Sequence, residues 1–357
     1  MLERNKTRQI RVGNVVMGGD SPITIQTMTN TNTADTLATI EQIEDIYKAG
    51  GELVRVAVPD EDAVKGLREI TKASPVPVIA DIHFHHELAL KAIDQGVAKV
   101  RINPGNLGGK EKLLQVAEKA GENGVALRIG VNAASLEKDI LQGYQGDSPS
   151  ALVKSAVRHV HYLEKFGFYN MVISLKASDA PATFQAYSLL AREVDYPLHI
   201  GVTEAGPYYR GTVKSAVGIG SLLMAGLGDT VRVSLTASPV EEVKTARLIL
   251  QAAGARIFGP ELISCPTCGR CEIDVPNLAA EVEDLIASKE HPWKIAVMGC
   301  VVNGPGEARN SHLGVTGTPR QGIIFKYGEI IRRVPRESLL EALQEELSNL
   351  ESAESGI

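Results

Sequence analysis

Three of the four cysteines in the chain lie in one short stretch, SCPTCGRCEID (264–274). They are Cys265, Cys268 and Cys271, and the fourth cysteine, Cys300, lies in the glycine-rich stretch MGCVVNGPGE. A C-x₂-C spacing lets two thiolates bind one metal centre, and Cys300 could supply a third thiolate. The sequence therefore predicts a metal or iron–sulfur site with sulfur ligands near the end of the chain.

Two ligand sets could complete this site. If Cys271 is the fourth ligand, a Cys₄ site results, which suits structural zinc or a saturated iron–sulfur cluster. If Cys271 is not a ligand, the carboxylate of Glu307 is the obvious candidate. A carboxylate exchanges from iron more readily than a thiolate and would leave one iron able to bind substrate. The spacing alone slightly favours zinc.

Positively charged residues also occur within five apolar segments that we expect to be strands. Burying a cation without a counter-charge costs several kcal/mol. Only two carboxylates, Asp81 and Glu204, lie where they could neutralise these cations. Two carboxylates cannot balance five cations, so the sequence predicts a ligand with more than one negative charge, such as a phosphate or diphosphate. The five cations are Arg55, Arg101, Arg128, Lys176 and Arg232.

Uncharged polar residues occupy the ends of the same segments and are expected to donate further hydrogen bonds to that ligand. They are Asn103, Asn132 and Ser174. Glu204, in GVTEAGP, is a candidate acid or base, and a structural ion pair is the equally weighted alternative.

The histidines are expected to have structural rather than metal-binding roles. His83 and His85, in DIHFHHE, are more often polar residues at the rim of a site than a metal-binding pair. His159 and His161 lie in a helix-like segment among charged residues, so we expect both at the surface.

Eight short apolar segments, most of them followed by helix-like segments, would position these residues. Several of the helix-like segments end in glycine, which is typical of helix ends. Eight such units in about 250 residues match a (β/α)₈ barrel, in which the carboxyl ends of the strands converge on one face. An open doubly wound sheet is the alternative, but no G-x-G-x-x-G motif follows an early strand. The expected strands are 22–28, 52–58, 77–84, 98–104, 126–132, 170–176, 198–204 and 230–236.

The strand–helix alternation stops near residue 255. We therefore expect a TIM-barrel domain that binds the substrate over residues 1–257 and a small α/β domain that binds the metal centre over 258–357. An inserted loop is expected at 141–149. In the second domain we expect helices over 276–288 and 337–350 and strands over 293–299, 313–317 and 322–328.

The composition is typical of a soluble globular protein. The net charge of −6 does not indicate a nucleic-acid-binding surface, and the N-terminal residues have no apolar run of the kind found in a signal peptide. The most apolar stretch, 215–228, is too short to span a bilayer and predicts a buried helix. We therefore expect a cytoplasmic protein, where a reducing environment favours metal or redox chemistry over disulfides.

Six motifs together resemble the 4-hydroxy-3-methylbut-2-enyl diphosphate synthase family. These are the iron–sulfur enzymes of the methylerythritol phosphate route to isoprenoids. The resemblance covers nearly the whole chain, which lacks the large middle domain of plant-type members and so resembles the two-domain bacterial form. The motifs are CPTCGRCEID, MGCVVNGPGEA, ADIHF, VRINPGN, RIGVN and GVTEAG.

The resemblance implies a [4Fe–4S] cluster bound by Cys265, Cys268, Cys300 and Glu307, with Cys271 not a ligand. It also implies that the substrate is 2-C-methyl-D-erythritol 2,4-cyclodiphosphate. Family members open this ring reductively and eliminate water, using two electrons from a ferredoxin or flavodoxin. A doubly phosphorylated substrate agrees with the polyanion predicted from the charged strand residues.

Roles for individual residues follow from the resemblance. Arg55, Arg101, Arg128 and Lys176 would bind the diphosphate. Glu307 would leave the cluster when a substrate oxygen arrives, and the cluster would act both as electron source and as Lewis acid.

Proton transfer would fall to Glu204, with Asp81 as the second candidate. The family also implies a homodimer in which the cluster domain of one chain covers the barrel of the other. Two other classes of function are weighed against this one. They are an electron carrier fused to an inert barrel, and a zinc-stapled phosphate-binding barrel without redox chemistry.

Overall fold

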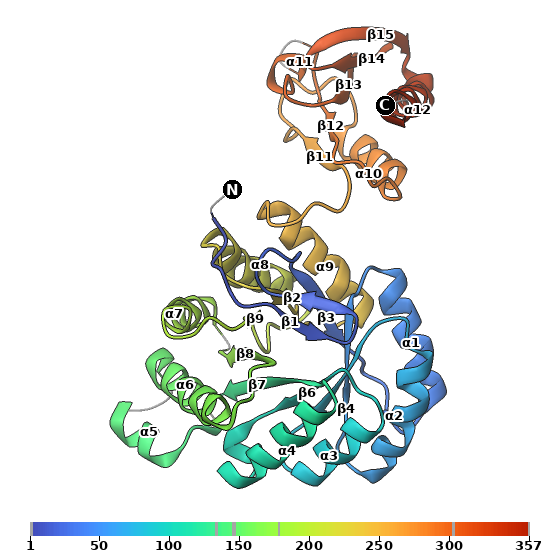
Figure 1. The fold of residues 1–357 in the computed structure, drawn as a ribbon. Helices are drawn as coiled ribbons and strands as arrows, with labels where there is room; N and C mark the ends of the chain where they lie inside the picture. The colour runs from blue at the N-terminus through green and yellow to red at the C-terminus, as the bar shows by residue number, and fades with distance from the viewer. Residues whose placement is uncertain (1–2, 133–134, 145–147, 178, 302–303, 356–357) are drawn as a thin grey trace. The chain divides into compact units, whose positions relative to one another are not determined.

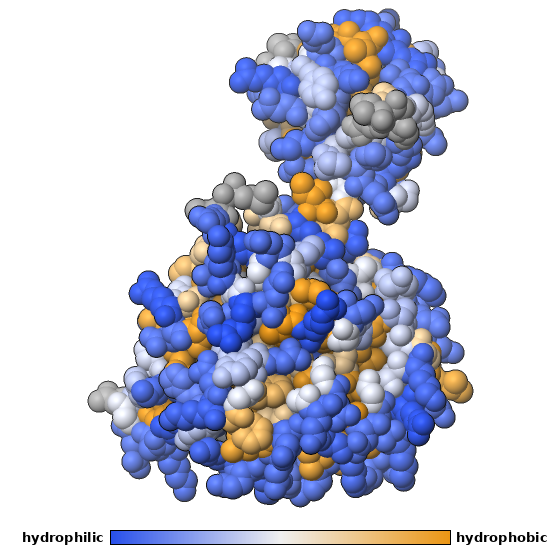
Figure 2. Space-filling model, viewed as in Figure 1, coloured by the Kyte–Doolittle hydropathy of each residue, from blue (hydrophilic) through white to orange (hydrophobic). Residues whose placement is uncertain are grey.

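The chain forms two compact units, Met1–Arg256 and Ile257–Ile357. In Figure 2 the visible face of each unit is covered mostly by hydrophilic residues, with scattered hydrophobic patches. None of the helices in the described part of the chain has the length and hydrophobicity needed to cross a lipid bilayer. The computed structural model describes residues 3–132, 135–144, 148–177, 179–301 and 304–355.

The unit Met1–Arg256 is a barrel of eight parallel strands surrounded by helices (Figure 1). The strands follow one another in the order β8-β7-β6-β5-β4-β3-β10-β9, and a parallel bridge between Ile173 and Leu198 joins the two ends of this series. This closure confirms the predicted (β/α)₈ barrel and excludes the open sheet. The strands are β3 (Thr24–Met28), β4 (Leu53–Ala57), β5 (Val78–Ile82), β6 (Lys99–Ile102), β7 (Ala126–Asn132), β8 (Met171–Lys176), β9 (His199–Ile200) and β10 (Thr230–Val231).

The last two strands of the barrel are much shorter than the predicted 198–204 and 230–236. The chain leaves β9 at Gly201, where an added Cβ would lie 2.4 Å from the carbonyl oxygen of Arg232. It then turns at Glu204, whose φ of 54° lies in the left-handed region that few non-glycine residues adopt. Glu204 is therefore in a turn beyond β9. The prediction that it ends a strand was wrong.

Side-chain caps fix where many of the barrel helices begin. At five helices, Asp35, Asp60, Ser148, Asp179 or Ser238 accepts a hydrogen bond from the backbone N–H three residues further on. The helices are α1 (Thr36–Lys48), α2 (Glu61–Ala73), α3 (His86–Asp94), α4 (Lys110–Glu122), α6 (Pro149–Phe166), α7 (Ala180–Leu190), α8 (Tyr208–Met224) and α9 (Pro239–Ala252).

The region predicted as an inserted loop at 141–149 is partly helical. Residues 141–144 belong to α5 (Lys138–Tyr144), residue 149 begins α6, and residues 145–147 lie outside the described part of the chain. The apolar stretch at 215–228, predicted as a buried helix, belongs to α8 as far as Met224, where that helix ends. It is only partly buried, because Val217 and Met224 are exposed.

A hairpin that was not predicted packs against the apolar end of the barrel interior. It consists of β1 (Ile10–Val12) and β2 (Val15–Met17), which pair antiparallel. The apolar cluster comprises Ile10, Val12 and Met17 of the hairpin with Leu53, Ile79, Ala126 and Val172 of the barrel strands. In the register of the barrel, Asp81 and Arg128 stand two residues beyond the cluster members Ile79 and Ala126, towards the carboxyl ends of the strands.

The unit Ile257–Ile357 is a five-stranded mixed sheet with two long helices. Its strand order is β11-β12-β13-β14-β15, in which the first three strands are parallel and the last two antiparallel. The buried Trp293 belongs to the core that the sheet forms with α10 and α12. Strands β11 and β15 were not predicted. The elements are β11 (Glu261–Ser264), α10 (Val275–Ile286), β12 (Lys294–Val297), α11 (Gly304–Glu307), β13 (Leu313–Gly317), β14 (Gln321–Lys326), β15 (Glu329–Pro335) and α12 (Leu339–Ser355).

Candidate functional site

Four of the five predicted cations gather inside the barrel. Arg55, Arg101 and Arg128 are buried on β4, β6 and β7, and Arg232 lies partly buried just after β10. Arg101 stands opposite Arg128 in the register of β6 and β7. The fifth cation, Lys176, ends β8, and its side chain is outside what the structure describes.

Asp81 at the end of β5 is the main counter-ion of this cluster. Arg101 Nη1 donates a hydrogen bond to its Oδ1 over 3.0 Å, while Arg55 Nε and His83 Nε2 lie 3.7 and 3.6 Å from its Oδ2. Burial opposes ionisation of Asp81, but Arg55, His83 and Arg101 together hold the pKa of its carboxyl well below the ordinary value. Asp81 is therefore an ionised partner of two arginines.

A further buried carboxylate, Glu242 of α9, also belongs to the site. Its two oxygens accept hydrogen bonds from the Thr27 hydroxyl and from the Leu235 backbone N–H. Burial lowers the pKa of Arg232, and Glu242 and Asp81 oppose this shift. The sequence analysis named only Asp81 and Glu204 as possible counter-ions and missed Glu242, because Glu242 lies on a helix.

The barrel interior holds still more basic groups than the sequence analysis identified. Lys99 of β6 and His199 of β9 are both buried. The crowding of like charges shows in the arginines. Burial and Arg232 lower the pKa of Arg55 to about 9, and burial, Arg55 and Arg101 hold the pKa of Arg128 well below its ordinary value. The positive charge thus exceeds the negative charge even with Glu242 counted, and an anion entering this site would relieve the repulsion.

A cavity of about 240 Å³ opens among these residues. Ser174 of β8 accepts a hydrogen bond from Arg128 Nε over 3.0 Å, so it holds Arg128 in place. Glu204 is exposed and lines the same cavity from its turn. Cationic and hydroxyl groups that converge on a small cavity suit a phosphate-bearing small molecule. Six of the lining residues are Arg55, Arg128, Ser174, His199, Glu204 and Arg232.

The two predicted asparagines differ in their surroundings. Asn103, after β6, is buried, and its amide nitrogen donates to Ser135 Oγ over 2.8 Å, which ties it to the segment after β7. Asn132 ends β7, and its buried Oδ1 has no hydrogen-bond partner among the described residues. Of the two asparagines, Asn132 is the one whose side-chain oxygen could still accept a hydrogen bond from a ligand.

The histidines only partly follow the prediction. His83 lies at the edge of the cation cluster, with its Nε2 2.9 Å from Arg101 Nη1. His161 is exposed, as predicted. His159 is buried instead, and its Nε2 contacts Glu137 Oε1 over 2.9 Å, because it lies on the face of α6 that packs inward. The expectation of a surface position for His159 was therefore wrong.

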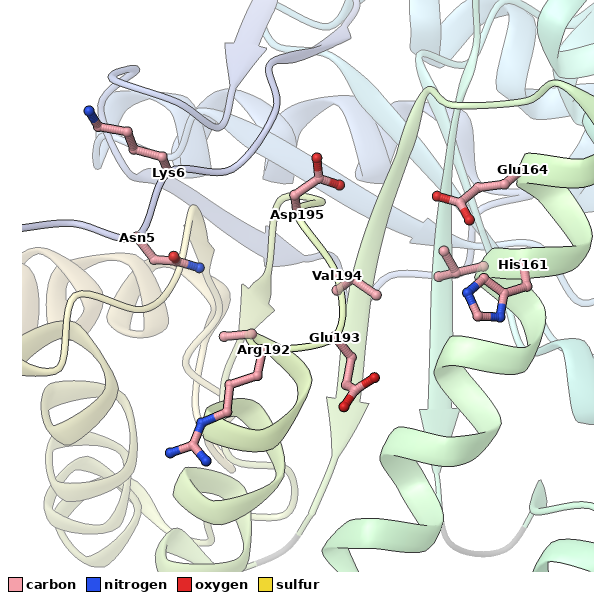
Figure 3. Close-up of a pocket in the computed structure, with 10 residues that line it drawn as sticks. Asn5, Lys6, His161, Glu164, Arg192, Glu193, Val194 and Asp195 are labelled. Atoms are coloured by element: carbon pink, nitrogen blue, oxygen red, sulfur yellow. The ribbon is translucent and has the colours of Figure 1, made fainter.

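A second cavity of about 340 Å³ lies on the barrel unit, away from the cations, and Figure 3 shows its lining. Its charged side chains carry both signs, and in Figure 3 Lys6 and Arg192 extend in different directions. The basic and acidic groups there do not converge on one point, so this cavity has no comparable anion site.

The cysteines of the second unit gather around Gly299. Its backbone N–H donates to Cys265 Sγ over 3.1 Å, and the N–H of Cys268 donates to Cys271 Sγ over 3.4 Å. An added Cβ on Gly299 would lie 2.5 Å from Cys271 Sγ and 3.4 Å from Cys265 Sγ. Glycine at this position therefore leaves room for two sulfurs.

The four thiols also interact electrostatically. Burial raises the pKa of Cys265, and Cys271, Cys300 and Cys268 raise it further, whereas the backbone N–H of Arg270 lowers that of Cys268. Among the described residues, no group of three or more His, Cys, Asp or Glu side chains is already arranged to hold a metal ion. Two sulfurs beside Gly299, and two further thiols close enough to raise the pKa of Cys265, nevertheless provide the donor chemistry that iron–sulfur clusters and zinc require, so these residues fit such a group.

Glu307 lies in the same unit, at the end of α11, and is exposed. The loop between Cys300 and α11 includes residues 302–303, which lie outside the described part of the chain. Cys300 and Glu307 thus flank the glycine-rich stretch VVNGPG (301–306) in the sequence.

The described residues thus form a closed barrel with an excess of buried cations at the carboxyl ends of its strands, followed by a unit that carries four cysteines. The barrel is a candidate site for an anionic small molecule, and the cysteines are a candidate site for a metal centre. The chain belongs to the GcpE family. The GcpE TIM-barrel domain matches residues 7–247, and the GcpE protein C-terminal domain matches residues 261–349.

Characterised relatives are similar over nearly their full length. The 4-hydroxy-3-methylbut-2-en-1-yl diphosphate synthase (flavodoxin) of Caldanaerobacter subterraneus is 53% identical over 97% of this chain and 98% of its own. The proteins of the same name from Clostridium acetobutylicum and Maridesulfovibrio salexigens are 52% and 53% identical, over 98% and 97% of this chain and 100% and 97% of their own.

Among solved structures, the type I 3-dehydroquinate dehydratase of Clostridium difficile resembles the chain with a TM-score of 0.51. The two sequences are 11% identical, and the match covers 70% of this chain and 98% of the other. At this identity the likeness concerns the barrel fold alone.

Proposed function

We propose that the chain catalyses the reductive ring opening and dehydration of 2-C-methyl-D-erythritol 2,4-cyclodiphosphate to (E)-4-hydroxy-3-methylbut-2-enyl diphosphate, a step of isoprenoid biosynthesis. The excess of buried positive charge in the barrel is the observation that carries this proposal, in a chain whose relatives bear the name of that enzyme. In the reaction two electrons and two protons are consumed, one ring carbon–oxygen bond to phosphate breaks, and a hydroxyl group leaves as water.

The barrel residues bind and orient the diphosphate. Arg55, Arg128 and Arg232 line the cavity and can each present N–H groups to phosphate oxygens, because several of their nitrogens have no partner among the described residues. We assign Arg101, Asn103, Asn132, Ser174 and Lys176 to the same binding site.

The two acidic groups near the cavity have different roles in this proposal. Asp81 is kept ionised by the arginines and acts as their counter-ion, which makes it a poor proton donor at neutral pH. Glu204 lines the cavity on an exposed turn and has no arginine partner among the described residues. We therefore assign proton transfer to Glu204.

The residues proposed to hold a [4Fe–4S] cluster are Cys265, Cys268, Cys300 and Glu307. When bound, such a cluster supplies electrons one at a time and a Lewis acid for the oxygen that leaves. The Gly299 N–H already donates to the Cys265 sulfur, a type of contact that tunes cluster potentials.

The electron donor and the assembly are also proposals. A flavodoxin is the favoured donor, because the relatives carry it in their names, and a ferredoxin is the alternative. A homodimer rests on the family resemblance and predicts that monomers are inactive. Constant activity per chain after dilution to monomers would contradict it.

Turnover of the cyclodiphosphate tests the proposed function. The full chain, purified without oxygen and loaded with iron and sulfide, is incubated with the substrate and a chemically reduced flavodoxin. We expect the linear diphosphate product, and none with Cys300→Ser. A protein that binds the cyclodiphosphate and accepts electrons but forms no product would overturn the proposal and favour a binding or carrier role.

A further inference from the structure

The barrel strands carry four further buried polar residues, the polar layer, to which the proposed function assigns no role. Gln26 of β3, Lys99 of β6, His199 of β9 and Thr230 of β10 are all buried. Each carries at least one side-chain nitrogen or oxygen without a hydrogen-bond partner among the described residues. Such groups are costly to leave unpaired, and several together indicate a function for the layer.

Lys99 is the most unusual member of this layer. Its side chain is 0% exposed, and its Nζ has no hydrogen-bond partner among the described residues. In the register of the barrel it stands between Ile79 and Ala126, both part of the apolar cluster that packs on the hairpin. It lies two residues before Arg101 and therefore shares the inward-facing side of β6.

Basic groups surround Lys99. Burial, Arg128 and Arg55 lower the pKa of its amine well below the ordinary value. Burial, Arg128, Lys99 and other cations lower that of His199 in the same way. A neutral amine is consequently the form that the empty barrel favours.

We propose that Lys99 responds to the charge of the anion site: its amine is neutral in the ligand-free barrel and binds one proton from solvent when phosphate groups enter the cavity lined by Arg55 and Arg128. The proposal rests on the proposed function only in that the natural ligand carries phosphate. No bond of the ligand breaks in this step.

The other charged groups of the interior do not supply this proton. Arg55, Arg128 and Arg232 are arginines, which keep their charge at neutral pH, and Asp81 is already ionised. Glu242 is hydrogen-bonded to Thr27 and Leu235. The competing proton acceptors are His199, which interacts electrostatically with Lys99, His83 at the rim, and Glu204, which lines the cavity.

The sign of the pH dependence follows from linkage. An anion favours the charged amine, so the bound form has the higher pKa. Between the two pKa values, binding takes up about one proton, and affinity falls up to about tenfold for each unit that the pH rises. A barrel whose interior charges are fixed would show neither effect.

Calorimetric titration of the full chain with the cyclodiphosphate, in two buffers of different ionisation enthalpy at one pH, measures this uptake. The phosphodiester-like groups of this ligand do not titrate near neutral pH, so the uptake belongs to the protein. We expect about one proton for the wild type and none for Lys99→Met, whose apolar side chain matches the register neighbours Ile79 and Ala126 and should allow folding. Lys99→Arg, with a fixed charge, should bind with no uptake and with an affinity that no longer falls as the pH rises.

His199→Gln and His83→Gln are the matched variants and should retain the uptake. No uptake in the wild type, or the same uptake in Lys99→Met, would overturn the proposal. If the cyclodiphosphate does not bind at all, the proposed function fails. Inorganic sulfate, which also does not titrate near neutral pH, then serves as the probe for Lys99. Proton uptake by the wild type that is lost in Lys99→Met would support the proposal, and no uptake, or equal uptake in both, would overturn it.

Discussion

Arg101 stands directly opposite Asp81 in the register of β6 and β5, and its Nη1 donates to the carboxylate over 3.0 Å. On its other side the guanidinium lies against Gly130 of β7, where an added Cβ would be 2.8 Å from its Nε. Asp81 on β5 and Gly130 on β7 thus hold the fully buried Arg101 in place between them. Its Nε and Nη2 have no partner among the described residues and remain available to an anion.

Arg128→Ala is expected to weaken substrate binding while leaving the second unit intact. Losing a charge-assisted hydrogen bond costs about 2 kcal/mol, which corresponds to roughly a thirtyfold rise in KM. The free energy of unfolding of the empty protein should not fall, because Arg55 and Arg101 lose a like-charged neighbour. Steady-state kinetics and denaturant unfolding measure the two effects. Arg158→Ala, a half-buried arginine of α6 paired with Asp139, is the control, and an unchanged KM in Arg128→Ala would refute this assignment.

Asp81→Asn is expected to destabilise the fold by roughly 3 kcal/mol at neutral pH, because Arg55 and Arg101 lose their counter-ion. The pKa of Asp81 is lower in the folded than in the unfolded chain. Its stabilising effect is therefore complete above the unfolded-state pKa and is lost as the pH falls through the folded-state value.

Denaturant unfolding of the metal-free chain at a series of pH values measures the stabilising effect of Asp81. The difference in unfolding free energy between wild type and Asp81→Asn should stay constant from about pH 7 to pH 5 and shrink below about pH 4. A difference that persists unchanged in strong acid would show that the two side chains differ for reasons other than charge.

Gly299→Ala is expected to reduce iron loading, because the new Cβ would lie 2.5 Å from Cys271 Sγ and 3.4 Å from Cys265 Sγ. The double variant Gly299→Ala/Cys271→Ala removes the closer sulfur and should restore much of the iron per chain, if Cys271 is not a ligand. Iron and sulfide analysis after reconstitution gives the answer. If the iron per chain stays low in the double variant, and Cys271→Ala alone also loses iron, Cys271 is a ligand.

Glu307→Cys is expected to separate electron transfer from catalysis. Four thiolates would hold a saturated cluster, so visible absorption and reduction by dithionite should persist while turnover of the cyclodiphosphate is lost. Glu329→Cys, which adds a thiol at an exposed position on β15, is the control and should turn over normally. Normal turnover by Glu307→Cys would remove Glu307 from the proposed ligand set.

The barrel and its arginines could be predicted from the sequence because each signal is local. A charged residue within an apolar β-branched run is conspicuous, and strand–helix alternation limits the fold to a few architectures. Lys99 was missed although AKVRINP contains the signal: its spacing of two residues from Arg101 places both on the same face of the strand.

Other features depend on contacts that no local pattern reveals. Glu242 reaches Thr27 across 215 positions in the chain and lies on a helix, where an acidic residue in the first turn is ordinary. His159 was misplaced because charged neighbours hid its position on the inward face of α6. Glu204 was placed at a strand end because the apolar run continues past the point where the backbone of β9 stops pairing.

The central claim is that the grouped cysteines hold an iron–sulfur cluster that serves reductive chemistry in the barrel. Its most direct test is the content of iron, acid-labile sulfide and zinc per chain, with the visible spectrum, in protein purified without oxygen. We predict about four iron and four sulfide per chain, with broad absorption that bleaches on reduction. Stoichiometric zinc without sulfide would contradict the account and leave a zinc-stapled, phosphate-binding barrel.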